Sequence, residues 1–451
     1  MSTTPMNRSE FLKLSAGAVA GMSVASLTAK SYARIPGAND RLRIGIVGSS
    51  ERGRGALLPA LFKVEKVMNA ELTAVCDLWS VNLEKGLQLV KARTGRTPAG
   101  YRNLDEMLNT DLDGVIVATG DPQHAPLLAR VVNAGKDCYC EKPMAINVPM
   151  AKEAAQAVKR SGRIVQIGTQ GLSDPGLWGL RKFIASGKLG KISHVEQVQS
   201  YWGPRWRGRS EPGLIKEEET NWKEWLGKYP PRSFDPRLYF EYRVFKDFST
   251  GIAGQWMSHQ VAAVALAMGE SFPHSVSSDG GIFVWNDGRE TPDVFAAHVV
   301  YPSGWMYTYM CNFGTDYPRH ERYYGLNGTI EEGPGGYVVS GIGGGGDDTP
   351  QNRERMTRQK NSAAGFHVNP NKIKEKFTIP PEGGTPGETI PAHMQNWLEC
   401  MRSRKTPNAD VMTGYCHSVA CIMAHQSGYV GRKLYWDRQK EEIVETPPGR
   451  V

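Results

Sequence analysis

RIGIV (residues 43–47), GSSERGRG (48–55) and ALLPALF (56–62) follow one another near the N-terminus and decide the fold. The first run is apolar and rich in β-branched residues, and the third suits a helix with proline in its first turn. A strand, a glycine-rich turn and a helix in this order give a dinucleotide-binding fingerprint its meaning. We expect Gly48 to allow the tight turn and Gly53 to allow close helix–strand packing. Ser50 replaces the middle glycine, so the motif alone is weak, and we place Ser50 and Arg52 beside the cofactor.

The next strand strengthens this interpretation. ELTAVC at 71–76 ends in Asp77, which follows Gly53 by 24 residues. An acid at the tip of the second strand binds the ribose hydroxyls of the cofactor and repels a 2′-phosphate. Asp77 therefore favours NAD over NADP. The alternative is that Asp77 only caps a helix or holds a turn.

Further strands alternate with helical segments, at 114–119 and 137–140. This alternation predicts a parallel sheet with helices on both faces, and ligands of such sheets bind beyond the carboxyl ends of the strands. The candidate cofactor-binding residues at those ends are Asp77, Thr119, His124, Glu141 and Lys142.

Length and composition bound the class of protein. The 451 residues, 40% hydrophobic and 22% charged, indicate two or three globular units. The net charge of +8 comes without a run of Lys or Arg, so we expect no nucleic-acid partner. The spacing Cys138-x-Cys140 is not that of a zinc site, so we expect no metal.

The N-terminus resembles an export signal. Residues 1–33 begin with weakly basic character, continue with a short apolar stretch and end in Ser-Tyr-Ala, which suits a signal peptidase. The segment NRSEFLK at 7–13 resembles a twin-arginine motif with Ser9 in place of the second arginine. The odd number of cysteines, seven, fits export of a folded chain to the periplasm. The alternative is an ordinary amphipathic helix; no apolar run reaches membrane-spanning length.

Together with the IGIVG and AVCD strands, the block VIVATGDPQHAPLLARVVNAGKDCYCEKPMA at 115–145 resembles the Gfo/Idh/MocA family, and the similarity continues through VQIGTQ at 165–170 and H-x-x-N-W-L at 393–398. The resemblance implies a Rossmann domain followed by an α/β domain with a large, mostly antiparallel sheet, in a homodimer or homotetramer. We accordingly expect a linker at 34–40, an NAD-binding domain at 41–165 and a substrate and oligomerisation domain at 166–437. Its C-terminal helices should pack back on the first domain, before a tail at 438–451.

The same resemblance suggests two catalytic residues. Lys142 is expected close to the nicotinamide, where burial and a neighbouring cation lower the pKa of an amine and allow it to transfer a proton. His259 lies on an apolar helix, in a motif where family dehydrogenases carry D-x-x-x-H; Gln255 stands here in place of the acid. The alternatives are a solvated lysine and a core histidine.

Other residues are candidates for the walls of the site. Tyr201 and Trp202 belong to an aromatic and basic segment that suits stacking on a sugar ring, although packing between domains is the alternative. Gln170 is a further candidate for the cofactor side. The remaining substrate candidates are Tyr242, Arg243, Asp247 and Gln255.

These residues predict an NAD-dependent oxidoreductase that acts on a sugar, a glycoside or a polyol. The missing acid at position 255 and the export signal raise an alternative. This is a redox-neutral glycoside hydrolase that oxidises C3, eliminates the aglycone, adds water and returns the hydride, without the usual pair of carboxylates. A second alternative is a non-catalytic sugar-binding protein.

Overall fold

The computed structural model describes residues 40–207, 212–359 and 367–448. The predicted export signal lies outside the described residues, as does most of the predicted linker. Residues 42–451 form one unit, separate from residues 1–41. All elements below belong to the unit 42–451.

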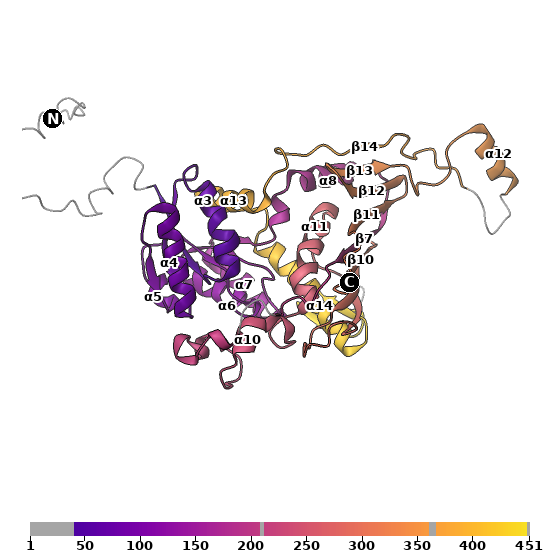
Figure 1. Cartoon of the computed structure of the whole chain (residues 1–451). Coiled ribbons are helices and arrows are strands. Elements are labelled where there is room, and N and C mark those ends of the chain that lie inside the picture. Colours follow the sequence, from indigo (N-terminus) through magenta and orange to yellow (C-terminus); the bar gives the residue numbers. More distant parts are fainter. Residues whose placement is uncertain (1–39, 208–211, 360–366, 449–451) are drawn as a thin grey trace, which may run out of the picture. The chain divides into compact units, whose positions relative to one another are not determined.

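The first domain is built on a parallel sheet of six strands in the order β3-β2-β1-β4-β5-β6 (Figure 1). This is the order of a Rossmann fold. Its strands are β1 (Leu42–Val47), β2 (Ala70–Cys76), β3 (Ala99–Tyr101), β4 (Gly114–Val117), β5 (Asp137–Cys140) and β6 (Val165–Ile167). Its helices are α3 (Leu58–Val64), α4 (Ser80–Thr94), α5 (Leu104–Leu108), α6 (Asp121–Asn133) and α7 (Val148–Ser161).

The glycine-rich turn has the tight geometry that the sequence predicts. Gly48 has φ +91°, and a Cβ there would lie 2.5 Å from the carbonyl oxygen of Ala118. A Cβ on Gly53 would lie 2.4 Å from the carbonyl oxygen of Gly48. Only glycine fits at these two positions. The helix that follows begins earlier than predicted, because a π-helical turn, Gly53–Leu57, precedes α3.

The second domain contains a ten-stranded sheet in the order β14-β13-β12-β11-β7-β10-β9-β8-β15-β16. All neighbouring strands run antiparallel except β7 and β10, which are parallel. The strands are β7 (Ile192–Ser200), β8 (Ser275–Gly281), β9 (Val294–Tyr301), β10 (Trp305–Asn312), β11 (His320–Gly325), β12 (Gly328–Gly333), β13 (Gly336–Ser340), β14 (Phe377–Thr378), β15 (Leu434–Asp437) and β16 (Glu442–Val444). The segment at 442–444, which the sequence analysis placed in a tail, is thus an edge strand.

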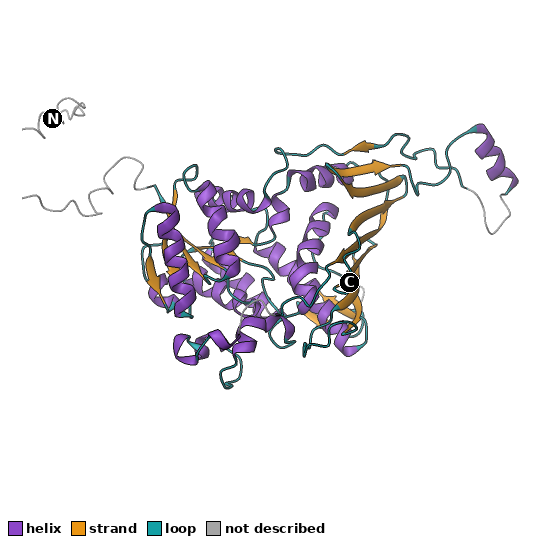
Figure 2. Ribbon diagram, viewed as in Figure 1, coloured by secondary structure: helices purple, strands orange, loops and turns teal. Residues whose placement is uncertain are grey.

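Helices gather on one face of this sheet (Figure 2). The helices of this domain are α8 (Pro175–Ala185), α9 (Trp222–Leu226), α10 (Pro236–Glu241), α11 (Ser258–Met268), α12 (Pro350–Arg358), α13 (Thr389–Ser403) and α14 (Val411–Val430). Short turns lie at η2 (Gln170–Ser173), η3 (Pro212–Leu214), η4 (Glu217–Glu219), η5 (Tyr242–Val244) and the π-helical η6 (Ala253–Met257). No helix in the described ranges has both the length and the hydropathy of a membrane crossing.

The C-terminal helices connect the two domains. Helix α13 lies beside α3 (Figure 1), and its Trp397 and Met401 are buried against Gly114 of β4. Helix α14 packs on α7 of the first domain and on β8 of the second. A single hydrophobic core therefore runs from the parallel sheet to the ten-stranded sheet.

Candidate active site

A cleft of about 1110 Å³ opens at the carboxyl ends of the parallel strands, with walls from both domains. Burial of a ligand between a strand edge and a second domain is the usual arrangement of an α/β enzyme. The predicted site residues that line the cleft are Gly48, Ser50, Arg52, Asp77, Thr119, His124, Glu141, Lys142, Gln170, Tyr242, Arg243, Gln255 and His259.

Asp77 faces the cleft at the end of β2 and also holds the turn. Its carboxylate accepts hydrogen bonds from the backbone N–H groups of Ser49, at 2.7 Å, and Trp79, at 2.9 Å. Burial raises the pKa of Asp77 to about 6, although these two bonds act in the opposite direction. The structural and the cofactor-binding interpretations of Asp77 therefore do not exclude each other.

A buried ion pair forms the floor of the cleft. Glu141 is 3% exposed, and its carboxylate lies 2.8 Å from a guanidinium nitrogen of Arg52. The side-chain amide of Gln170 donates to the same carboxylate, at 2.9 Å, and to the hydroxyl of Tyr139, at 2.8 Å. Gln170 therefore connects Tyr139 of β5 to the carboxylate of Glu141 at the end of that strand.

Lys142 lies next to this floor, before the cis peptide bond to Pro143. Its Nζ donates to the backbone carbonyl oxygen of Gln255, at 2.7 Å. Burial lowers the pKa of Lys142 to about 8; Glu141 and Asp121 oppose this shift, whereas Arg243 and Arg52 add to it. An amine with this pKa exchanges its proton near neutral pH, which suits general acid–base chemistry.

Gln255 belongs to the π-helical turn that precedes α11, and its side chain is buried. The amide oxygen accepts from Nε of Arg243, at 2.9 Å, and the amide nitrogen donates to the carboxylate of Asp121. The amide therefore lies between a cation and an anion. Short π-helical segments frequently occur at functional sites because they change which groups face a ligand.

His259 is half-buried in the first turn of α11 and lines the cleft. Burial, followed by the charges of Lys142 and Arg52, lowers the pKa of His259 well below its usual value. The imidazole is therefore neutral at physiological pH, and it contributes a hydrogen-bonding group without a charge.

Four predicted site residues do not line the cleft. Gly53 supports the turn from behind, and Asp247 is exposed elsewhere. Trp202 is 63% exposed and meets Trp285 edge-on, because the chain turns away from the sheet after β7. Tyr201 stacks behind Trp256, with ring centroids 4.2 Å apart, and Trp256 is the residue that reaches the cleft.

His124 lines the cleft, and each of its ring nitrogens faces a backbone carbonyl oxygen. Nδ1 lies 2.8 Å from the carbonyl oxygen of Pro143, and Nε2 lies 3.1 Å from that of Thr119. His124 therefore connects the ends of β4 and β5, and its ring is fixed by these contacts.

The sequence analysis missed several cleft residues. The most important is Asp121, the first residue of α6, which is 2% exposed. Its position directly after a strand end and a glycine was a signal for it. The missed aromatic residues are Trp79, Tyr229, Tyr239, Phe240 and Trp256.

The segment between β7 and α11 forms a roof over part of the cleft, and we call residues 212–243 the roof segment. It carries the aromatic side chains of Trp222 and Trp225, which pack in one cluster with Phe248. Two contacts tie it to the first domain: Gln123 Nε2 donates to the carbonyl oxygen of Trp225, at 2.7 Å, and Arg130 pairs with Glu224, at 2.6 Å.

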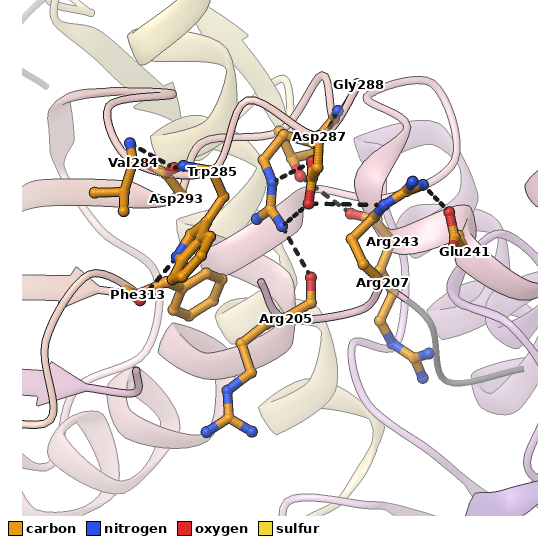
Figure 3. Close-up of polar contacts among 12 residues, drawn as sticks. Arg205, Arg207, Glu241, Arg243, Val284, Trp285, Asp287, Gly288, Asp293 and Phe313 are labelled. Atoms are coloured by element: carbon orange, nitrogen blue, oxygen red, sulfur yellow. Dashed lines mark hydrogen bonds and ion pairs between the residues drawn. The ribbon is translucent and has the colours of Figure 1, made fainter. Parts of the chain in front are cut away.

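A charged network anchors the roof segment to the second domain (Figure 3). Arg207 pairs with Glu241 and lies 3.6 Å from Asp287. The fully buried guanidinium of Arg289 donates to Asp287, at 2.8 Å, and to the carbonyl oxygen of Arg205, at 3.2 Å. The roof is therefore held from both sides.

Comparison with known proteins identifies the first domain. Residues 42–169 match the family described as "Oxidoreductase family, NAD-binding Rossmann fold" (GFO_IDH_MocA). The first domain is an NAD-binding Rossmann domain. The match confirms the predicted Rossmann domain and its NAD cofactor. Two features of the NAD-binding domain fit a dinucleotide: the crowded glycines at 48 and 53, and Asp77 facing the cleft.

Individual relatives and solved structures are similar at low sequence identity. The inositol 2-dehydrogenase of Azotobacter vinelandii is 28% identical over 152 residues, which are 33% of this chain and 43% of that protein. The match thus spans less than half of the relative's length. The solved aldose-aldose oxidoreductase of Caulobacter crescentus, complexed with glycerol, has a TM-score of 0.63 and 17% identity. The alignment covers 88% of this chain and 99% of that one.

A second solved structure is similar over both domains. The WlbA dehydrogenase of Bordetella pertussis, in complex with NADH and UDP-GlcNAcA, has a TM-score of 0.59 and 20% identity, over 87% of this chain and 98% of that one. These likenesses confirm the predicted fold, in which the NAD-binding domain precedes a domain with a large, mostly antiparallel sheet.

Proposed function

We propose that the protein is an NAD-dependent oxidoreductase that moves a hydride between a hydroxyl-bearing carbon of a sugar, glycoside or polyol and a tightly held nicotinamide. The observation that carries this proposal is Lys142, whose amine lies in the cleft at the end of β5 and whose pKa is lowered to about 8. When bound, NAD would supply the acceptor and donor of the hydride.

The residues of this chain have distinct roles in the proposal. Lys142 takes the proton of the substrate hydroxyl during oxidation and returns it during reduction. The neutral imidazole of His259 hydrogen-bonds to the same hydroxyl, and Trp256 offers an aromatic face to the substrate. On the cofactor side, Asp77 binds the ribose, and the floor around Glu141 holds the nicotinamide end.

Replacement of Lys142 tests the proposal. A Lys142→Met variant is expected to lose about 10²- to 10⁴-fold in kcat, the usual contribution of an acid–base group. It should still bind NAD, measured by fluorescence titration with NADH. The matched control is Lys182→Met, because Lys182 is exposed and its ion pair with Glu382 is exposed on both sides.

The pH dependence provides a second criterion. Oxidation needs the neutral amine, so its kcat/KM should rise with pH through about 8 and level off above it. Reduction needs the ammonium form and should show the opposite dependence. A Lys142→Met variant with unchanged turnover would contradict the role of this residue.

A redox-neutral glycoside hydrolase is the second candidate, and one observation favours it. Position 255, where the resembling dehydrogenases carry an acid, holds a buried glutamine whose amide is fixed by Arg243 and Asp121. Incubation with nitrophenyl glycosides and trace NAD⁺ separates the candidates. Release of nitrophenol without net NADH supports the hydrolase, and stoichiometric NADH from free sugars or polyols supports the dehydrogenase. Binding of a sugar without either product would indicate a non-catalytic sugar-binding protein.

We further propose that the chain is exported to the periplasm by a twin-arginine-like route and forms a homodimer or homotetramer. The N-terminal sequence supports export, and the seven cysteines, all of them free thiols and six of them buried, suit a protein that folds before export. Cell fractionation tests the route: an Arg8→Ala variant, altered in the twin-arginine-like segment, should stay in the cytoplasm while the unaltered protein reaches the periplasm. Light scattering of the purified protein tests the oligomer.

A further inference from the structure

Asp121 places a second carboxylate in the cleft, on an element that the predicted catalytic set does not include. It is the first residue of α6, a helix of 13 residues, and it is 2% exposed. A helix N-terminus stabilises a negative charge. The carboxylate also accepts hydrogen bonds from the hydroxyls of Ser249, at 2.8 Å, and Tyr242, at 3.3 Å.

The strongest link from Asp121 to the proposed acid–base group runs through Gln255. The side-chain nitrogen of Gln255 donates to Asp121, and the backbone oxygen of the same residue accepts from Lys142. The side-chain oxygen of Gln255 accepts from Arg243. Gln255 thus contacts one anion and two cations, and hydrogen bonds at both its side-chain oxygen and its side-chain nitrogen fix the orientation of the amide.

We propose that Asp121 is a positioning residue of this site: its carboxylate, bound to the side-chain amide of Gln255, supplies the negative charge that position 255 does not carry, and holds the carbonyl that binds Lys142. This inference rests on the proposed function, because it concerns the acid–base group of that function. It adds a residue from the NAD-binding domain that faces the substrate side of the cleft.

The charges around Lys142 show why the carboxylate of Asp121 affects the protonation of this amine. The anions that face it are Glu141 from its own loop and Asp121 from α6. Glu141 is already paired with Arg52, so its field is partly compensated. The other cation is Arg243 from η5, and the neutral side chains are His259 from α11 and His417 and Cys421 from α14. The Gln255 amide lies between Asp121 and Arg243, and the negative charge of Asp121 opposes the effect of Arg243 on the pKa of Lys142.

The sign of the effect follows from this arrangement. An anion favours the ammonium form of Lys142, so removal of the Asp121 charge should lower the pH at which the amine loses its proton. The shift expected for Asp121→Asn is about one pH unit, which is a tenfold change in the proton equilibrium. Transfer of the charge to the neighbour, in the double variant Asp121→Asn/Gln255→Glu, keeps one carboxylate and one amide in contact and should restore the midpoint.

The experiment measures the protonation of Lys142 directly. Competitive labelling of the full protein with isotopic acetic anhydride, read by mass spectrometry between pH 6 and 10, gives the titration midpoint of this amine with and without added NAD⁺. The pH dependence of kcat/KM for oxidation is recorded in parallel. Ser249→Ala is the matched control, because it removes a hydrogen bond to Asp121 and leaves every charge in place.

We expect the titration midpoint of Lys142 to be lower in Asp121→Asn than in the unaltered protein. In the double variant and in Ser249→Ala it should equal that of the unaltered protein. Equal midpoints in all four proteins would overturn the proposal, as would an equal shift in Asp121→Asn and Ser249→Ala. If Asp121→Asn does not fold, Gln255→Glu alone decides: its second carboxylate should raise the midpoint, and an unchanged or lower one contradicts the proposal. Because labelling needs no turnover, a protein without oxidoreductase activity refutes the proposed function and leaves this test intact.

Discussion

The side chain of Asp77 both holds the glycine-rich turn and faces the cofactor cleft. Each of its carboxylate oxygens accepts a backbone N–H, from Ser49 and from Trp79, so the residue closes the glycine-rich turn onto the start of α4. The same carboxylate faces the cleft. A negative charge there repels the 2′-phosphate of NADP and leaves the ribose hydroxyls of NAD as partners.

Asp77→Asn should therefore weaken the preference for NAD over NADP by at least about tenfold, or roughly 1.4 kcal/mol. The amide keeps one acceptor oxygen, so one of the two backbone N–H groups loses its partner, and the melting temperature should also fall. The measurement is the ratio of the dissociation constants for NADH and NADPH, which is independent of a uniform loss of folded protein.

Glu84→Gln is the control for this prediction, because Glu84 is an exposed residue of α4, the helix that follows Asp77, and accepts a hydrogen bond from Gln88. Its coenzyme ratio should equal that of the unaltered protein. An Asp77→Asn variant with an unchanged ratio would show that Asp77 acts only on the turn.

At the scale of elements, local sequence patterns predicted the strands of the NAD-binding domain, whereas the large second sheet was predicted from the family resemblance alone. Strands β1, β4 and β5 have consecutive buried residues, and so does the end of β2, so they appear in the sequence as short, mostly apolar runs. In the second domain, β7 pairs with β10 and β11, more than 100 residues further along the chain. No local pattern encodes pairing over that distance.

The same reasoning separates the predicted from the missed site residues. Lys142 and Gln170 follow directly from strand ends, whereas the contact between Gln255 and Asp121 joins residues 134 positions apart. Trp202 and Asp247 were predicted from residue type alone. Residue type does not show on which side of an irregular segment a side chain lies, and neither residue lines the cleft.

The anchor of the roof segment leads to a prediction for stability. Asp287 is the carboxylate partner of Arg289, whose side chain is fully buried. Asp287→Ala leaves that guanidinium without its counter-ion, which should lower the free energy of unfolding by about 3 kcal/mol. Urea denaturation followed by tryptophan fluorescence measures this loss.

Glu445→Ala provides the comparison, because its pair with Arg432 is exposed on both sides. Exposed pairs contribute little, so this variant should unfold close to the unaltered protein. If Asp287→Ala were as stable as Glu445→Ala, the buried network would not hold the roof segment.

At the scale of the whole molecule, the cleft is a feature of two domains and a roof. The parallel sheet supplies the turn, Asp77 and Lys142; the second domain supplies His259 and Gln255; the roof segment adds aromatic walls at Trp225 and Tyr239. Because the shared core and α13 and α14 connect the domains, the walls of the cleft are not free to separate without loss of buried apolar surface.

This enclosure predicts slow release of the cofactor. Arg102 donates to the carbonyl oxygens of Leu78 and Glu219, and Arg130 pairs with Glu224, so both arginines tie the NAD-binding domain to the roof segment. We expect dinucleotide to remain with the protein through desalting. In the double variant Arg102→Ala/Arg130→Ala the rate of NADH release should rise about tenfold, since two exposed polar links together are worth roughly 1–1.5 kcal/mol.

Stopped-flow displacement of NADH, followed by its fluorescence, measures this rate. Arg160→Ala, on the exposed face of α7, should release NADH as the unaltered protein does. Rapid release of NADH from the unaltered protein would contradict the prediction that the roof segment retains the cofactor. Equal release rates in the double variant and the control would show that the walls of the cleft retain it without these two arginines.

A cofactor that stays bound through many turnovers must be returned to its starting oxidation state in the same cleft. If turnover is faster than the release of NADH, the hydride must pass from the bound cofactor to a second substrate or back to the same substrate.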